Sequence, residues 1–223
     1  MKCKYCESEC IKKGQRDGIQ RYQCKKCNKY QQENYHKPVI TDEKYQWVKQ
    51  LNNEGCGISS ISRLLKISKS SVQRLIQRIA LLIKKPNYVD YLQVYEIDEV
   101  KTYCGNKRNE CWIMYALNRT SGAIIDYCVG RRTKENLSKI TNTVLALNPK
   151  RVYTDGLNIY PTLIPHDVHK VFKFCTNKIE RNNLTIRTWL KRLNRKTICY
   201  TKNIQMLNNS LRLLFWSMKF EII

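Results

Sequence analysis

Two C-x-x-C pairs near the start of the chain constrain its fold more than any other feature. They are Cys3-Lys4-Tyr5-Cys6 and Cys24-Lys25-Lys26-Cys27, with seventeen residues between them. Each pair can form a tight turn whose thiolates point at one ion, and a hairpin can bring the two turns together around a tetrahedral site. We therefore expect a zinc ribbon over residues 1–38 that folds around Zn²⁺. Its ligands would be Cys3, Cys6, Cys24 and Cys27, whereas Cys10 lacks a partner at this spacing. Incidental cysteine pairs are the alternative, and a redox C-x-x-C would not require the second pair.

The charge balance points to a polyanionic partner. Lys and Arg number 41 against 18 Asp and Glu, a formal net charge of +23. Such an excess favours contact with a phosphate backbone. Around the second cysteine pair, Arg21, Lys25 and Lys26 interleave with Tyr22 and Tyr30, a pattern that suits DNA, although a solvated charged face is the alternative.

No apolar stretch reaches the about 18–20 residues that span a bilayer, and the first residues show no apolar signal region. We therefore expect a cytoplasmic, nucleoid-associated protein with no membrane partner. Without an export signal, the eleven cysteines favour metal binding and reduced burial over a disulfide framework.

A helical pattern follows the ribbon. Thr41-Asp42-Glu43 is a capping start, Gly55-Cys56-Gly57 ends the first helix, and further helices are expected at Ile58–Leu65 and from Lys69 to about Ile83. This is the outline of a helix-turn-helix over residues 39–85, although a helical connector would share it. The start of the third helix would enter the major groove. The DNA-binding candidates there are Lys69, Ser70, Ser71, Gln73 and Arg74.

The rest of the chain, residues 90–223, alternates strand and helix patterns after a break at Lys84-Lys85-Pro86-Asn87. Three strands come first and alternation follows, which predicts a mixed sheet flanked by helices. The strands are expected at Gln93–Val100, Cys111–Leu117, Ala123–Val129, Arg151–Thr154 and near Lys170–Phe174. The helices are expected from Thr133 to about Leu147, near Leu157–Tyr160, from Asn177 to about Leu193, and over Leu207–Trp216.

Three acids stand out against this basic background. Asp98 lies late on the first strand of the domain, Asp155 follows the fourth, and Glu180 opens the long helix. In a ribonuclease-H-like sheet these places converge at one edge. Carboxylates that converge there could hold two divalent ions. A cap or turn role is the alternative for Asp155 and Glu180, whereas Asp98 in an apolar strand has no such explanation.

Several residues near the three acids are further candidates. Alternation along a strand predicts that Glu99 faces away from Asp98 and that Glu96 shares its face. Arg187 lies two helical turns after Glu180 and is well placed to hold a phosphate. His166 and His169 fit a loop better than a metal pair, because prolines flank them.

The ordered combination of these features resembles the InsAB-type transposases of bacterial insertion sequence one. The resemblance covers nearly the whole chain and is most specific at Arg21-Tyr22-Gln23-Cys24 and over 179–187. It rests also on Gly55–Leu65, on Ile97-Asp98-Glu99 and on Tyr153-Thr154-Asp155-Gly156. One departure is that Asn182-Asn183 follows Arg181 where relatives often carry a histidine.

The resemblance implies a DDE transposase with an α/β, ribonuclease-H-like mixed-sheet catalytic domain behind the zinc ribbon and the helix-turn-helix. Its catalytic acids would be Asp98, Asp155 and Glu180, which would hold Mg²⁺ or Mn²⁺, and Arg187 would be the downstream basic residue. The twenty-four residues between Asp155 and Glu180 leave no room for an inserted domain.

The expected partners are double-stranded DNA, as element ends and target, and further copies of the chain in a dimer or larger assembly, because two ends must be brought together. Two rivals remain open. One is a DNA-binding regulator whose second domain lacks catalysis, and the other is a ribonuclease-H-like nuclease.

Overall fold

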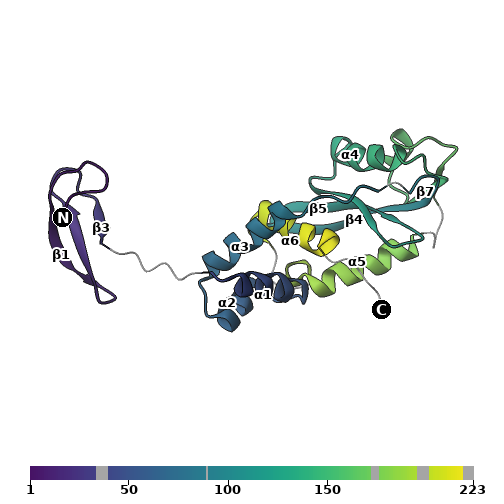
Figure 1. The fold of residues 1–223 in the computed structure, drawn as a ribbon. Coiled ribbons are helices and arrows are strands. Elements are labelled where there is room, and N and C mark those ends of the chain that lie inside the picture. Colours follow the sequence, from purple (N-terminus) through teal and green to yellow (C-terminus); the bar gives the residue numbers. More distant parts are fainter. Residues whose placement is uncertain (34–39, 89, 172–175, 195–200, 218–223) are drawn as a thin grey trace. The chain divides into compact units, whose positions relative to one another are not determined.

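The computed structural model describes residues 1–33, 40–88, 90–171, 176–194 and 201–217. The chain divides into two compact units, Met1–Thr41 and Asp42–Ile223 (Figure 1). Among the described helices, none is both long and apolar enough to cross a membrane.

The smaller unit is a three-stranded antiparallel sheet of β1 (Cys10–Arg16), β2 (Ile19–Cys24) and β3 (Tyr30–Gln32), in that order. The β1–β2 turn places Asp17 and Gly18 at φ values of 53° and 75°, the left-handed geometry that tight hairpins favour. The buried side chain of Gln31 donates to the Lys2 carbonyl and accepts from the Lys4 amide, both at 2.8 Å. These bonds tie the chain start to the last strand.

Three helices open the larger unit: α1 (Asp42–Asn53), α2 (Ile58–Leu65) and α3 (Lys69–Leu82). The Ser68 hydroxyl caps α3 by accepting from the Ser71 amide at 3.0 Å. Their apolar faces meet in a common core. Val48 of α1 is buried whereas the neighbouring Trp47 is exposed, because the helix packs on one side only.

A five-stranded mixed sheet forms the centre of this unit and confirms the predicted mixed α/β architecture. Its strands, in the order β6-β5-β4-β7-β8, are antiparallel from β6 to β4 and parallel from β4 to β8. They are β4 (Val94–Cys104), β5 (Asn106–Asn118), β6 (Ile124–Gly130), β7 (Arg151–Thr154) and β8 (His169–Val171).

The first two strands of this sheet are longer than predicted. They meet at Gly105, whose φ of 78° makes the tight turn, and β5 begins five residues before the predicted Cys111. The polar sequence there gives no apolar alternation. Backbone pairing and the ion pair between Lys101 and Glu110 hold this end of the hairpin together.

Helices cover both faces of the sheet (Figure 1). On one face lie α4 (Lys134–Leu145) and the short helix η1 (Tyr160–Thr162); on the other lie α5 (Asn177–Trp189), the short helix η2 (Lys191–Leu193) and α6 (Ile204–Trp216). The predicted strand near Lys170–Phe174 is observed as β8, and its last three residues lie outside the described ones.

Helix α6 belongs to two cores at once. Leu207, Leu211 and Leu214 pack on the sheet, whereas Met206 and Leu213 pack with α1–α3. The Arg212 guanidinium also donates to the Ile83 carbonyl at 2.8 Å. Because α6 serves both cores, α1–α3 are docked on the sheet as part of one compact unit.

Candidate active site and metal centres

Asp98 lies on β4 and is half-buried on the sheet face that carries α5. One carboxylate oxygen accepts from the Glu99 amide at 2.7 Å, and the other accepts from Asn183 Nδ2 at 2.6 Å. Burial raises the pKa of Asp98, and the charges of Asp155 and Glu180 raise it further. The Asp98 carboxylate is therefore fixed by hydrogen bonds and lies near other acidic side chains. A bound cation would be stabilising there.

Asp155 comes directly after β7, which runs parallel to β4. Its Oδ1 accepts from the Leu157 amide at 3.1 Å, an Asx turn that fixes the carboxylate at the strand end. Parallel pairing of Glu96 with Tyr153 brings the next residues of both strands to the same sheet edge. One oxygen each of Asp98, Glu99 and Asp155 lies within 4.8 Å of the others.

The inclusion of Glu99 corrects the prediction that it faces away from the other acids. Its side chain does start on the opposite sheet face, where Tyr160 donates to Oε1 and Arg132 lies 3.9 Å from Oε2. However, β7 ends at Thr154, so no strand covers this edge of β4 and the carboxylates of both faces meet there. Burial raises the pKa of Glu99 to about 7.

Glu96 has a structural task instead. It is completely buried; Oε2 accepts from the Ile179 amide at 2.8 Å, and Oε1 lies 3.1 Å from Arg119 Nε as an ion pair. The carboxylate thereby satisfies a free amide in the first turn of α5 and places that helix on the sheet. The sequence did not distinguish this role from a place among the site acids.

The first two turns of α5 bring side chains toward Asp98. Asn183 donates to Asp98 and accepts from the Tyr115 hydroxyl at 2.6 Å, and that hydroxyl also lies 3.1 Å from the Ile179 carbonyl. Glu180, one turn earlier, is exposed and accepts from the Thr176 hydroxyl at 3.1 Å. Glu180 is not among the three carboxylates that meet within 4.8 Å, although its charge acts on Asp98.

Arg187 contacts the backbone after α5, and the two histidines lie outside the carboxylate cluster. Arg187 Nη1 donates to the Leu193 carbonyl at 3.0 Å and so fixes the turn after α5. His169 is the first residue of β8 rather than a loop residue, and its Nε2 lies 2.8 Å from the Thr154 hydroxyl, next to Asp155. Neither His166 nor His169 belongs to a metal-ligand cluster within the described residues.

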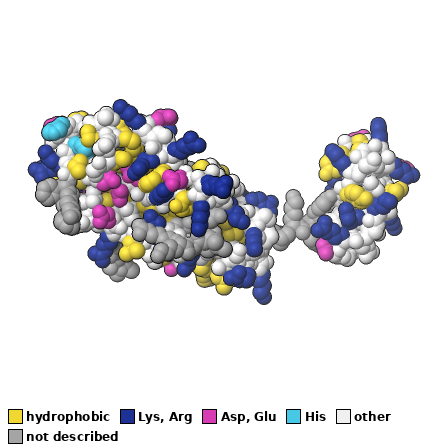
Figure 2. Space-filling model, turned by 180° about the vertical axis from the view of Figure 1, so that it is seen from behind, with side chains coloured by type: hydrophobic (Ala, Val, Ile, Leu, Met, Phe, Trp, Pro, Cys, Tyr) yellow, Lys and Arg dark blue, Asp and Glu magenta, His cyan; other side chains and the backbone are white. Residues whose placement is uncertain are grey.

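The carboxylates of Asp98, Glu99 and Asp155 fit a small divalent ion. With oxygen ligands at about 2.1 Å, an octahedral ion separates neighbouring oxygens by about 3.0 Å and opposite ones by about 4.2 Å. One oxygen of each of the three carboxylates lies within 4.8 Å of the others, a spacing compatible with such an ion. Figure 2 shows acidic side chains grouped on one face of the larger unit among scattered Lys and Arg side chains.

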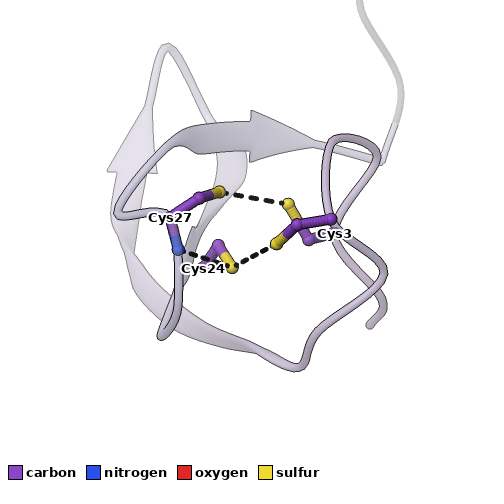
Figure 3. Close-up of side chains that lie close together, drawn as sticks. Cys3, Cys24 and Cys27 are labelled. Atoms are coloured by element: carbon purple, nitrogen blue, oxygen red, sulfur yellow. Dashed lines mark hydrogen bonds between the residues drawn. The ribbon is translucent and has the colours of Figure 1, made fainter.

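The four cysteines of the two C-x-x-C pairs converge in the smaller unit. All four sulfur atoms lie within 4.8 Å of one another, with Cys3–Cys27 at 3.6 Å and Cys6–Cys24 at 3.4 Å. Figure 3 shows Cys3 and Cys27 pointing toward each other from the two turns. Bonds of about 2.3 Å to a tetrahedral ion place sulfurs about 3.8 Å apart, so the cluster fits zinc.

Backbone amides of the second turn point at the same sulfurs. The Lys26 and Cys27 amides donate to Cys24 Sγ at 3.3 and 3.4 Å, so the turn holds this sulfur in place with its own backbone. Cys10 is outside the four-sulfur group, as expected, and accepts from Gln31 Nε2 at 3.6 Å.

The predicted DNA-binding side chains are accessible in both units. In the ribbon, Lys25 and Lys26 are exposed, and the Arg21 guanidinium lies 4.5 Å from the centre of the Tyr30 ring. On α3, Lys69, Ser70, Gln73 and Arg74 are exposed and Ser71 is half-buried.

Comparisons with known proteins agree with the resemblance. The family model described as IS1 transposase matches residues 92–217. An insertion element iso-IS1n protein InsB of Shigella dysenteriae is 35% identical over 113 residues, 51% of this chain and 86% of that protein. An insertion element IS1 protein InsB of Shigella flexneri is 31% identical over 50% of this chain and 85% of its own length.

A simian T-cell lymphotropic virus intasome structure is similar at 13% identity, with a TM-score of 0.43, over 78% of this chain and 68% of its own. A likeness at this level carries no argument about this protein.

Proposed function

Because this chain belongs to the IS1 transposase family, we propose that it is a DDE transposase, which cuts DNA at the ends of its insertion sequence and joins them to target DNA. The observation that carries the proposal is the meeting of Asp98 and Asp155 at the sheet edge where α5 begins. The strand order and directions of the sheet support a ribonuclease-H-like catalytic domain over residues 90–223.

In this proposal Asp98, Asp155 and Glu180 hold Mg²⁺ or Mn²⁺. Such ions would activate a water or a 3′-hydroxyl and stabilise the leaving oxygen. Glu180 lies one turn before Asn183 on the helix that Asn183 bonds to Asp98, and its charge acts on Asp98. Glu99 adds a fourth carboxylate, and Arg187 is the proposed phosphate contact two turns beyond Glu180.

The other parts would bind DNA. Residues 1–38 would form a zinc ribbon held by Cys3, Cys6, Cys24 and Cys27, with Arg21, Lys25 and Lys26 on phosphates. Residues 39–85 would act as a helix-turn-helix that reads the terminal inverted repeats through the start of α3. A dimer or larger assembly would pair the two ends, and the protein would work in the cytoplasm on the nucleoid.

Cleavage of labelled element ends tests this function. With Mg²⁺ the wild type is expected to cut at the element boundary, and Asp98→Asn is expected to lose cutting by about 10³-fold or more while still binding the ends. Asp167→Asn is the matched control, because Asp167 is exposed and lies outside the acid cluster.

The same assay separates the rivals. Specific binding of ends without any metal-dependent cutting would favour a regulator. Cutting without joined products would favour a nuclease. Cutting by Asp98→Asn at the wild-type rate would contradict the assignment of that acid.

A further inference from the structure

A cavity of about 540 Å³ lies between α1–α3 and the end of α5, outside the acidic site. It is walled by the turn after α1, the start of α3, the residues that follow α5 and the start of α6. The two sides approach closely: a Cβ atom at Gly55 would lie 2.7 Å from the Trp189 carbonyl oxygen. The cavity is therefore framed by the backbone of one compact unit.

Cations dominate the charged lining of this cavity. Lys69, Lys191, Arg192 and Lys202 line it, and no acid lines it within the described residues. Arg192 is half-buried; its Nη1 lies 3.4 Å from the Thr201 hydroxyl, and no described acid lies within ion-pair distance. Burial lowers the pKa of Arg192. A cation that is partly withdrawn from water and has no counter-charge is costly, so an anion in the cavity would be stabilising.

The chemistry of this lining selects the kind of ligand. A ligand that offers only acceptor oxygens and carries negative charge would satisfy the lysine and arginine side chains, and a phosphate diester has that chemistry.

The cavity adjoins the helix that the proposed function assigns to DNA reading. Lys69 is the first residue of α3, and Gln73, one turn later, also lines the cavity. The amino end of α3 adds the partial positive charge of a helix terminus. DNA seated on the start of α3 would thus pass directly over the cavity.

We propose that this cavity binds a backbone phosphate of the element end that α3 reads. Through that phosphate, Lys191, Arg192 and Lys202 of the proposed catalytic domain would contact the same DNA. The inference rests on the proposed function and extends it. It makes α5 a spacer, because Glu180 lies near one end of that helix and the cavity at the other.

The length of this spacer limits which phosphate is held. From Glu180 to Trp189 the helix rises about 14 Å, and the turn to Arg192 adds about 6 Å. Because successive base pairs rise about 3.4 Å, the held phosphate must lie within about six base pairs of the cleavage site.

Removal of the exposed lysines tests the contact. We expect Lys191→Ala with Lys202→Ala to lower the slope of log affinity against log salt by about two, measured on a labelled 40-base-pair duplex carrying the terminal repeat. The matched control, Lys134→Ala with Lys139→Ala, removes two exposed charges from α4 on the other sheet face (Figure 1) and should leave the slope unchanged. An unchanged slope in the first variant would overturn the proposal.

Neutral methylphosphonate linkages locate the contact. Placed singly along the duplex, they should weaken wild-type binding at least about fivefold at one to three linkages within six base pairs of the cleavage site, the loss expected for one charged contact. The double-lysine variant should show no further loss at those linkages. Equal losses in both proteins, or sensitive linkages only outside that window, would overturn the proposal.

Inorganic phosphate distinguishes a free anion from DNA. If phosphate, compared with chloride at equal ionic strength, raises the Tm of the wild type but the double-lysine variant binds the duplex like wild type, the cavity is a small-anion site and the proposal fails. Wild-type cleavage of element ends would remain in that case, so this failure is distinguishable from failure of the transposase assignment.

Discussion

At the scale of single residues, Asp98 depends on neighbours that no motif identifies. The side-chain amide of Asn183 donates from Nδ2 to Asp98 Oδ2. Its Oδ1 accepts from the hydroxyl of Tyr115, a buried residue on the adjacent strand. Asn183 and Tyr115 together orient the Asp98 carboxylate through neutral groups, as residues that position a metal ligand do.

Replacement of Asn183 by Leu should therefore raise the Mg²⁺ concentration needed for half-maximal cleavage by about 10–100-fold. The measurement is cleavage rate against Mg²⁺ concentration, and Leu184→Ala on the exposed side of α5 is the control. A variant that loses rate at every Mg²⁺ concentration without a shift in the midpoint would contradict a positioning role.

The raised pKa of Glu99 predicts that the stability of the protein without added Mg²⁺ depends on pH. Burial raises its pKa to about 7 in the folded chain, so between about pH 5 and 7 the folded state holds a proton that the unfolded state has lost. Stability should thus fall as pH rises through this window, by about 3 kcal/mol in total. Urea unfolding of the wild type and Glu99→Gln at several pH values checks this, and parallel curves would contradict it.

At the scale of elements, the junction between α1 and α5 fixes the first three helices against the rest of the larger unit. Gly55 has a φ of 74° and lies against the Trp189 carbonyl, so both its conformation and its contact exclude a side chain. The glycine was predictable as a helix stop, but its contact with α5 was not.

Gly55→Ala should consequently lower the free energy of unfolding by about 2 kcal/mol or more, because left-handed strain and a backbone clash add. Denaturant unfolding measures the change. Gly57→Ala is the control, because a Cβ there meets nothing within 4 Å. Equal losses in the two variants would show that the contact with Trp189 contributes nothing.

Removal of metal should affect the stability of the two compact units differently. A chelator should unfold the ribbon, whose small sheet has little apolar core, while the thermal transition of residues 42–223 persists. Amide NMR spectra report both units, and Cys24→Ser should reproduce the chelator's effect whereas Cys56→Ser, outside the sulfur cluster, should not. A ribbon that stays folded after complete zinc removal would contradict this.

Local patterns predicted the elements well where apolar periodicity and stop signals agree. The strand Arg151–Thr154 and the helix Ile58–Leu65 have the predicted bounds. The polar end of the β4–β5 hairpin was missed because pairing there comes from backbone and ions. Glu99 was misplaced because alternation assumes a covered edge. The role of Asn183 depends on contacts with distant segments that local patterns do not encode.

At the scale of the whole molecule, the chain combines a cysteine cluster, a helical segment and a mixed sheet, with acids grouped at one sheet edge and cations distributed over the rest. A net charge of +23 provides general affinity for DNA, while the carboxylates Asp98, Asp155 and Glu180 would confine chemistry to one point on it. We propose that DNA is both cut and joined at this point.

Joining of pre-cut ends tests that claim most directly. Duplexes that end at the element boundary are incubated with supercoiled plasmid and Mg²⁺, with either a 3′-hydroxyl or a 3′-deoxy terminus. We predict joined products only with the 3′-hydroxyl, at least about 10³-fold fewer with Asp155→Asn, and no covalent protein–DNA intermediate. Joined products from 3′-deoxy ends, or undiminished joining by Asp155→Asn, would contradict the account.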